Sequence, residues 1–234
     1  MTQAPHHPSS NALIERHTAV KERLDAINDT YQANPKAVLL AVSKTKPSSD
    51  IATLYQAGQS QFGENYLQEA LIKMSKLAHL PITWHYIGHI QRNKTRDIAM
   101  HFDWVQTVER AIIAERLNDQ RPDDHPPLNV LIQINIDDEA SKSGCRIDEL
   151  DGLVQTVMGL PKLTLRGLMI IPSKDGTDAF VRTKAIFDDI KGRFNLPDFD
   201  TLSMGMSGDM EQAVAHGSTM LRVGTAIFGE RDYG

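Results

Sequence analysis

The amino-acid sequence predicts an α/β fold, a single closed (β/α)8 TIM barrel with an N-terminal helical extension. Apolar runs alternate with helical patterns about eight times along the 234 residues, as in parallel strands joined by crossover helices. The runs carry Val, Ile and Leu at consecutive positions, which is typical of strands buried on both faces. No Gly-x-Gly-x-x-Gly turn follows the first run, so a closed barrel is favoured over an open dinucleotide-binding sheet.

The first elements are a long helix, a strand and a short helix. Apolar residues recur at helical spacing over residues 11–32, and Ser9, Ser10 and Asn11 stand at the start as capping candidates. The apolar run 37–43 lies between two prolines and predicts the first strand. A second helix opens at Ser48, and Gly58 is placed to end it.

The alternation of strand and helix continues to the end of the chain. Asn65, with Gln68 three residues later, resembles a capping box for the third helix. The other strands are predicted at 61–64, 83–88, 103–108, 129–135, 163–171, 201–206 and 219–223. The other helices are predicted near 67–77, 93–102, 111–117, 150–157, 180–194, 209–216 and 225–228. The loop 118–127 is too short to link two cores, so we expect one domain over residues 11–234 after a flexible N-terminus, residues 1–10.

Composition restricts the classes of function. The net charge is −5, and acidic and basic residues are interspersed, which argues against a nucleic-acid partner. The only cysteine, Cys145, allows no disulfide framework and fits a reducing compartment. Residues 1–10 lack the apolar segment of a signal peptide, and no later run approaches the roughly 20 residues of a membrane span. We expect a cytoplasmic protein without a membrane partner.

Lys44 is the first candidate for chemistry. It follows the apolar run 37–43 directly, and active sites in α/β barrels lie where the strands end. Apolar surroundings lower the affinity of a primary amine for its proton, so a lysine in such a place can attack an aldehyde near neutral pH. Because structural lysines outnumber catalytic ones, position alone favours a lysine that only marks the strand's exit into solvent.

Two later segments suit a phosphate group. Residues 203–208 and 222–225 each combine glycine and hydroxyl side chains with the start of a helix, and barrels often bind phosphate after strands seven and eight. Taken singly, either segment could serve only as a turn and cap. An amine after strand one and a phosphate site across the mouth predict a phosphorylated aldehyde held as a Schiff base, as in pyridoxal 5′-phosphate sites.

Five segments, in a fixed order, carry a family resemblance. They are AVSKTKP (41–47), FGENY (62–66), WHYIG (84–88), SMGMS (203–207) and RVGTAIFG (222–229). Together they closely resemble the pyridoxal phosphate homeostasis protein family, also called YggS or PROSC, and the match extends from about residue 12 to the C-terminus. The resemblance implies a barrel like the N-terminal domain of alanine racemase, without the second domain that supplies a catalytic tyrosine in the racemase.

The resemblance also assigns roles to individual residues. It implies a Schiff base on Lys44, with Lys46 as its unmodified neighbour. The remaining cofactor-binding positions that it implies are Asn65, His85 and Met169 around the ring, Arg222 at the pyridine nitrogen, and Ser203, Ser207, Gly224 and Thr225 at the phosphate. Because a guanidinium does not readily give up a proton, the cofactor would be a weaker electron sink than when an aspartate is the partner.

The resemblance therefore implies a monomeric protein of pyridoxal phosphate homeostasis that holds the cofactor without amino acid turnover. Apo-enzymes that depend on pyridoxal phosphate would be the recipients. Two other functions stay open: a small racemase or decarboxylase using the same lysine, with Tyr66 or Tyr86 as second acid/base group, and an aldolase in which Lys44 attacks a sugar phosphate without a cofactor.

Three further sequence features carry weaker functional predictions. Lys142, in the polar loop 136–144, is a candidate for a second, weaker aldehyde-binding amine. The sequence contains no His-Glu-x-x-His motif, so we expect no metal site. Residues 205–209 fall one glycine short of the Gly-x-Ser-x-Gly nucleophile elbow, which argues against a serine hydrolase.

Overall fold

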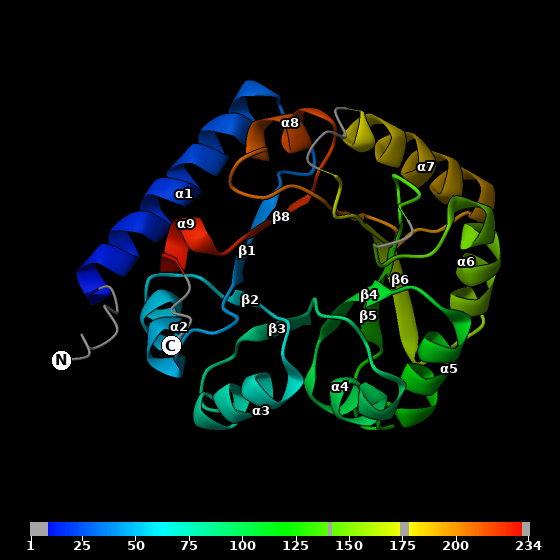
Figure 1. Cartoon of the computed structure of the whole chain (residues 1–234), viewed down its shortest axis with the longest axis horizontal. Coiled ribbons are helices and arrows are strands. Elements are labelled where there is room, and N and C mark those ends of the chain that lie inside the picture. Colours follow the sequence, from blue (N-terminus) through cyan, green and yellow to red (C-terminus); the bar gives the residue numbers. More distant parts are fainter. Residues whose placement is uncertain (1–8, 140–141, 174–177, 231–234) are drawn as a thin grey trace.

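A computed structural model describes residues 9–139, 142–173 and 178–230. Eight parallel strands close into a barrel in sequence order, with β1 paired to both β2 and β8 (Figure 1). The strands are β1 (Val38–Val42), β2 (Gln61–Glu64), β3 (Thr83–Tyr86), β4 (Trp104–Val108), β5 (Leu128–Gln133), β6 (Leu163–Met169), β7 (Thr201–Ser203) and β8 (Met220–Val223). The predicted TIM barrel is confirmed.

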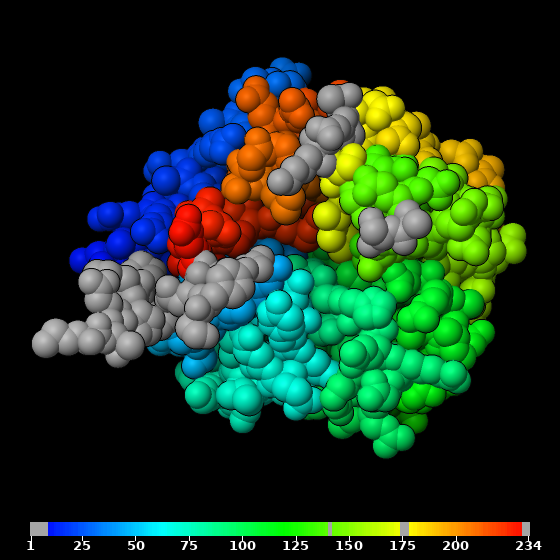
Figure 2. Space-filling model, in the orientation of Figure 1, coloured from blue at the N-terminus to red at the C-terminus, as the bar shows by residue number. Residues whose placement is uncertain are grey.

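The helices surround the barrel, and α1 lies across its outside next to α9 (Figure 1). They are α1 (Ser10–Thr30), α2 (Ser48–Gln56), α3 (Leu67–Lys76), α4 (Thr95–His101), α5 (Ala111–Gln120), α6 (Leu150–Met158), α7 (Ala179–Phe194), α8 (Met210–Ala215) and α9 (Thr225–Phe228), with short 3-10 turns η1 (Arg92–Lys94) and η2 (Ile147–Glu149). In the space-filling view the red C-terminal residues lie against the blue and cyan residues of the first strands and helices, because the barrel closes between β8 and β1 (Figure 2).

Successive side chains of a strand point to opposite faces, so the strands border two apolar regions. Leu40, Ile87 and Met220 pack together with Val42 inside the barrel. Leu39, the neighbour of Leu40, faces the other way and belongs to the larger core between the strands and the helices. Both faces of the strands are therefore buried, which explains why the sequence shows unbroken apolar runs.

Side-chain hydrogen bonds tie α1 to the barrel. The Ser9 hydroxyl accepts the Ala12 N–H (3.3 Å) and caps the helix as predicted. Asn28, which is buried, donates to the Ala37 carbonyl (3.0 Å) and accepts the Ala37 N–H (2.8 Å) just before β1. Of the predicted flexible N-terminus, residues 1–8 lie outside the described residues, and α1 already begins at Ser10.

Several boundaries differ from the sequence prediction. The strand predicted at 201–206 ends at Ser203, because Gly205 turns the chain with a φ of +93°. The capping box at Asn65 is wrong: Tyr66 is the N-cap of α3 and no side chain caps this helix end. Within the described parts of the chain, none of the helices combines the length and apolar character that a membrane crossing requires.

Candidate functional site at the barrel mouth

A cavity of about 200 Å³ opens where the carboxyl ends of β1, β2, β3, β6, β7 and β8 meet. Seven of the nine side chains or glycines predicted to bind the cofactor line it, namely Lys44, Asn65, Met169, Ser207, Arg222, Gly224 and Thr225. The other lining residues are Val42, Lys46, Ile87, Ile171, Met206, Phe228 and Gly229. Segments far apart in the sequence thus converge on one site.

The lining of this cavity is basic. Lys44, Lys46 and Arg222 contribute to it, together with the hydroxyls of Ser207 and Thr225, and the described lining residues include no carboxylate. A cleft lined by charge of one sign concentrates ions of the opposite sign. The cavity is therefore suited to an anionic ligand with apolar parts, because Met169 and the other apolar side chains form the rest of its wall.

The turn that carries Lys44 is fixed by backbone hydrogen bonds. The Ser43 N–H continues the ladder to the Gly63 carbonyl (3.0 Å), and the Lys46 N–H closes the turn on the Ser43 carbonyl (3.0 Å). Thr45 has a φ of +66°, a left-handed conformation that non-glycine residues seldom adopt. Lys44 therefore stands in a specific, tightly constrained turn at the end of β1.

Arg222 forms a buried wall of the cavity, with only 6% of its surface exposed. Its guanidinium donates to the carbonyl and the hydroxyl of Ser203 (both 2.8 Å) and to the Ile170 carbonyl (2.7 Å). Burial lowers the pKa of Arg222 to about 10, so the group is still charged at neutral pH. Three fixed acceptors leave the plane of the guanidinium little freedom.

The two remaining predicted residues, Ser203 and His85, lie beneath the cavity and do not line it. The Ser203 hydroxyl donates to Gln106 Oε1 (2.7 Å), and Gln106 Nε2 donates to His85 Nδ1 (3.0 Å). Burial lowers the pKa of His85 to about 3, so its ring is neutral. Gln106 was not predicted, although a glutamine between the apolar residues of a predicted barrel strand indicates a buried polar network.

Asn65 has an open hydrogen-bonding position. Its Oδ1 is buried beside the cavity and has no hydrogen-bond partner among the residues that the structure describes. This unpaired buried oxygen is costly unless a ligand or water supplies the donor. The backbone of Asn65 is closely packed as well. A Cβ on Gly88 would lie 2.2 Å from the Asn65 carbonyl oxygen, so glycine is needed for the loop after β3 to pack here.

The loop after β7 is shaped by Gly205. A Cβ at this residue would lie 2.4 Å from the Ala213 side chain of α8, so only glycine lets the loop fold against that helix. The same loop places Ser207 at the cavity. The Ser207 carbonyl accepts a hydrogen bond from Arg23 of α1 (3.0 Å). Helix α1 was not predicted to reach this loop.

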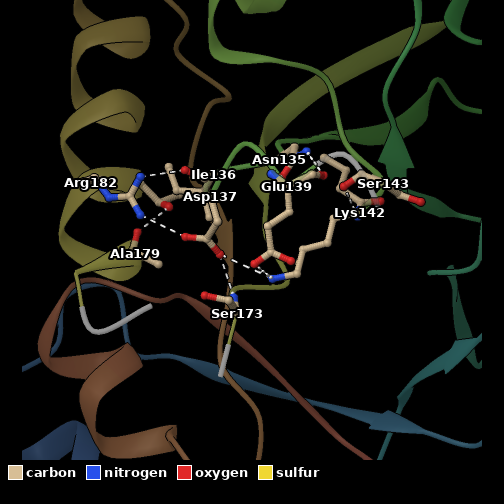
Figure 3. Close-up of polar contacts among 11 residues, drawn as sticks. Asn135, Ile136, Asp137, Glu139, Lys142, Ser143, Ser173, Ala179 and Arg182 are labelled. Carbon is tan, nitrogen blue, oxygen red and sulfur yellow. Dashed lines mark hydrogen bonds and ion pairs between the residues drawn. The ribbon is translucent and has the colours of Figure 1, made fainter. Parts of the chain in front are cut away.

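Lys142 lies outside this cavity. It lines a neighbouring pocket that shares Asn65, Ile87 and Ile171 with the cavity. Figure 3 shows its ammonium between Asp137 Oδ2 (3.4 Å) and Glu139 Oε1 (3.2 Å). The predicted role of Lys142 as a second amine stays a prediction.

The two tyrosines of the racemase alternative do not line the cavity. Tyr66 is 51% exposed at the N-cap of α3. Tyr86 donates to the His89 carbonyl (3.1 Å), and burial raises its pKa. Among the described lining residues, lysine and arginine are the only titratable groups.

Known proteins similar to this chain agree on one family. Residues 16–232 match the family model described as alanine racemase, N-terminal domain. The pyridoxal phosphate homeostasis protein of Escherichia coli (strain K12) is 51% identical over 95% of this chain and 98% of its own. The chain belongs to the pyridoxal phosphate homeostasis protein family. The family member from Pseudomonas aeruginosa is 53% identical over 96% of this chain and 98% of its own.

Solved structures support the same assignment. PipY of Synechococcus elongatus, whose structure has PLP bound, is 31% identical with a TM-score of 0.82, over 93% of this chain and 100% of its own. Alanine racemase from Corynebacterium glutamicum shares the fold, with a TM-score of 0.69 and 16% identity over 96% of this chain and 62% of its own. The family and fold predicted from the five sequence segments are confirmed.

Proposed function

We propose that this chain binds pyridoxal 5′-phosphate at the barrel mouth as a Schiff base on Lys44. It would act in intracellular pyridoxal phosphate homeostasis without turning over an amino acid. The observation that carries the proposal is the convergence of a lysine amine, a buried arginine and two hydroxyls on one cavity without a carboxylate in its described lining. The names of the curated relatives and the PLP in the PipY structure support it.

The residues present fit this cofactor. Lys44 provides the amine, and Ser207, Gly224 and Thr225 provide a neutral, hydrogen-bonding place for the phosphate. The unpaired Asn65 Oδ1 offers an acceptor for a ligand donor. When bound, pyridoxal phosphate supplies an aldehyde carbon that bonds to an amine nitrogen with loss of one water.

Arg222 would face the ring nitrogen as a hydrogen-bond donor. With a pKa of about 10 it remains a cation at neutral pH and does not pass its proton to a pyridine. Ser203 was predicted at the phosphate, but its only proton is donated to Gln106 and its oxygen accepts from Arg222. We assign Ser203, Gln106 and His85 to the support of Arg222.

An adduct map tests the proposal. The protein is incubated with pyridoxal phosphate, reduced with sodium borohydride, digested and analysed by mass spectrometry, with Lys44→Ala as the control. We expect the reduced adduct on the Lys44 peptide and its absence from the variant. A wild-type protein without an adduct on Lys44 would refute the proposal and leave the aldolase alternative. An adduct on Lys44 alone would dismiss the second amine at Lys142.

The state of assembly and the recipients belong to the same proposal. We expect a monomer, with a mass near the 26.1 kDa of one chain by light scattering. The cargo would pass to apo-enzymes that depend on pyridoxal phosphate. Mixing the loaded protein with such an apo-enzyme should restore activity faster than an equal concentration of free pyridoxal phosphate restores it. Equal rates would contradict delivery.

A further inference from the structure

We infer that Lys73, Glu64 and Glu69 form a charged clamp, buried at Lys73 and Glu64, that positions the turn carrying Lys44. This inference rests on the proposed function, because it concerns the lysine that would hold the cofactor. Glu64 is the last residue of β2, Glu69 and Lys73 lie on α3, and none of the three lines the cavity. They are therefore positioning residues, which act through the backbone on either side of Lys44.

Lys73 is the centre of the clamp. It projects from α3, its side chain is 6% exposed, and its ammonium contacts three acceptors. These are Glu64 Oε1 (2.7 Å), Glu69 Oε1 (2.5 Å) and the Ser43 carbonyl (2.8 Å). The contacts with Glu64 and with the Ser43 carbonyl are hydrogen bonds, and the contact with Glu69 is an ion pair.

Both carboxylates bond to the neighbours of Lys44. Glu64 Oε1 accepts the Ser43 hydroxyl (2.6 Å), and Glu69 Oε1 accepts the Thr45 N–H (2.6 Å). The residues before and after Lys44 are thus each linked to a carboxylate that Lys73 also contacts. The left-handed conformation of Thr45 is held by the bond to Glu69.

The energetics indicate that the clamp positions the turn that carries Lys44 and does not serve the stability of the fold alone. Burial raises the pKa of Glu64, which records the free-energy cost of keeping its charge out of water. Well-packed apolar residues in place of this ion pair would stabilise the fold about equally without that cost. Charged hydrogen bonds are directional, however, and a turn displaced by about 1 Å can lower reactivity by orders of magnitude.

Glu69 gives the cleaner test, because its side chain is 32% exposed and its loss leaves the core intact. Glu69→Ala removes the acceptor of the Thr45 N–H, whereas Glu69→Gln keeps an oxygen in that place. We expect Glu69→Ala to weaken pyridoxal phosphate binding about tenfold and Glu69→Gln to stay within about twofold of wild type. Equal affinities for Glu69→Ala and wild type would overturn the inference.

Lys73 is tested with its buried partner neutralised. Lys73→Met alone leaves Glu64 as an unpaired buried charge, so the variant to use is Lys73→Met with Glu64→Gln. The matched control is Lys76→Met, one turn along α3 and exposed. We expect the double variant to bind pyridoxal phosphate about tenfold more weakly and the control to bind like wild type. A folded double variant with wild-type affinity would contradict the clamp.

Hydrogen exchange in the protein without cofactor separates the clamp from the proposed function. The Thr45 amide should exchange about tenfold faster in Glu69→Ala and at the wild-type rate in Glu69→Gln and Lys76→Met. Unchanged exchange in Glu69→Ala would refute the clamp even if Lys44 takes the cofactor. A wild-type protein that forms no adduct on Lys44 would refute the proposed function, while the exchange result would still decide whether the turn is clamped.

Discussion

At the scale of single residues, neighbouring polar side chains at the mouth occupy different positions. Ser207 and Thr225 line the cavity, whereas Ser203 lies under it and bonds to Arg222 and Gln106. Motif position could not separate the two serines, because both occur in one short segment, residues 203–207. The separation depends on where β7 ends and on the direction of each side chain.

Ser203 and Ser207 should respond differently to the phosphate of the ligand. Ser207→Ala should weaken binding of pyridoxal phosphate about tenfold and leave binding of pyridoxal nearly unchanged, because a hydrogen bond to a charged group is lost. Ser203→Ala should weaken both ligands by a similar factor, since it loosens Arg222. Spectroscopic titration with each ligand measures this. If Ser203→Ala weakened binding of the phosphorylated ligand alone, the result would support the original prediction that Ser203 binds the phosphate.

The buried neutral His85 makes stability depend on pH. Its pKa is 6.5 in the unfolded reference and about 3 when folded, so the unfolded state binds more protons between these values. The stability that neutral His85 contributes is therefore present above pH 6.5 and is lost as the pH falls below it. The loss is about 2 kcal/mol at pH 5, by the linkage relation.

Urea unfolding of wild type and His85→Gln at pH 7.5 and pH 5 measures this contribution. The destabilisation caused by the substitution should shrink by about 2 kcal/mol at the lower pH. His79→Gln, at an exposed residue, serves as control and should show no such change. A constant difference between wild type and His85→Gln would contradict a neutral, buried imidazole.

At the scale of elements, the predicted strand ends brought most of the site together. Lys44, Asn65 and Arg222 could be predicted at one mouth because parallel strands in a barrel share one carboxyl end. The clamp could not be predicted, because Lys73 lies on an ordinary amphipathic helix 30 residues from Ser43. The role of Gln106 could not be predicted for a similar reason. Its hydrogen-bonded network inside the barrel joins side chains from four different strands.

Asn28 is one of the residues that attach helix α1 to the barrel. Asn28→Ala removes both bonds to the Ala37 backbone and leaves a buried N–H and a buried carbonyl unpaired. We expect a loss of about 2–4 kcal/mol in the free energy of unfolding. Chemical denaturation measures it, with Asn11→Ala on the exposed face of α1 as the control. A loss below about 0.5 kcal/mol would show that α1 is not fixed through this residue.

At the scale of the whole molecule, the described lining of the barrel mouth offers lysines and an arginine as its only titratable groups. Racemisation needs acid/base groups on both faces of the reacting carbon. The described lining contributes two lysines, Lys44 and Lys46, from the same turn after β1, and neither Tyr66 nor Tyr86 lines the cavity. Arg222, still cationic near neutral pH, is a poor proton carrier. The described lining thus agrees with the proposal that the barrel holds the aldehyde without transforming a substrate bound to it.

This difference predicts the outcome of an amino acid challenge. The loaded protein, incubated with L-alanine in deuterium oxide, should exchange the α-proton no faster than an equal concentration of free pyridoxal phosphate. The reason is that the described lining offers, besides Arg222, only two lysines, and both come from the same turn. Chiral chromatography and mass spectrometry follow inversion, exchange and decarboxylation together, with Lys44→Ala as the blank. A panel of other amino acids extends the test to other side chains. Sustained inversion or loss of carbon dioxide that depends on Lys44 would make the chain an enzyme and would place the missing acid/base group on a residue that moves into the cavity when substrate binds.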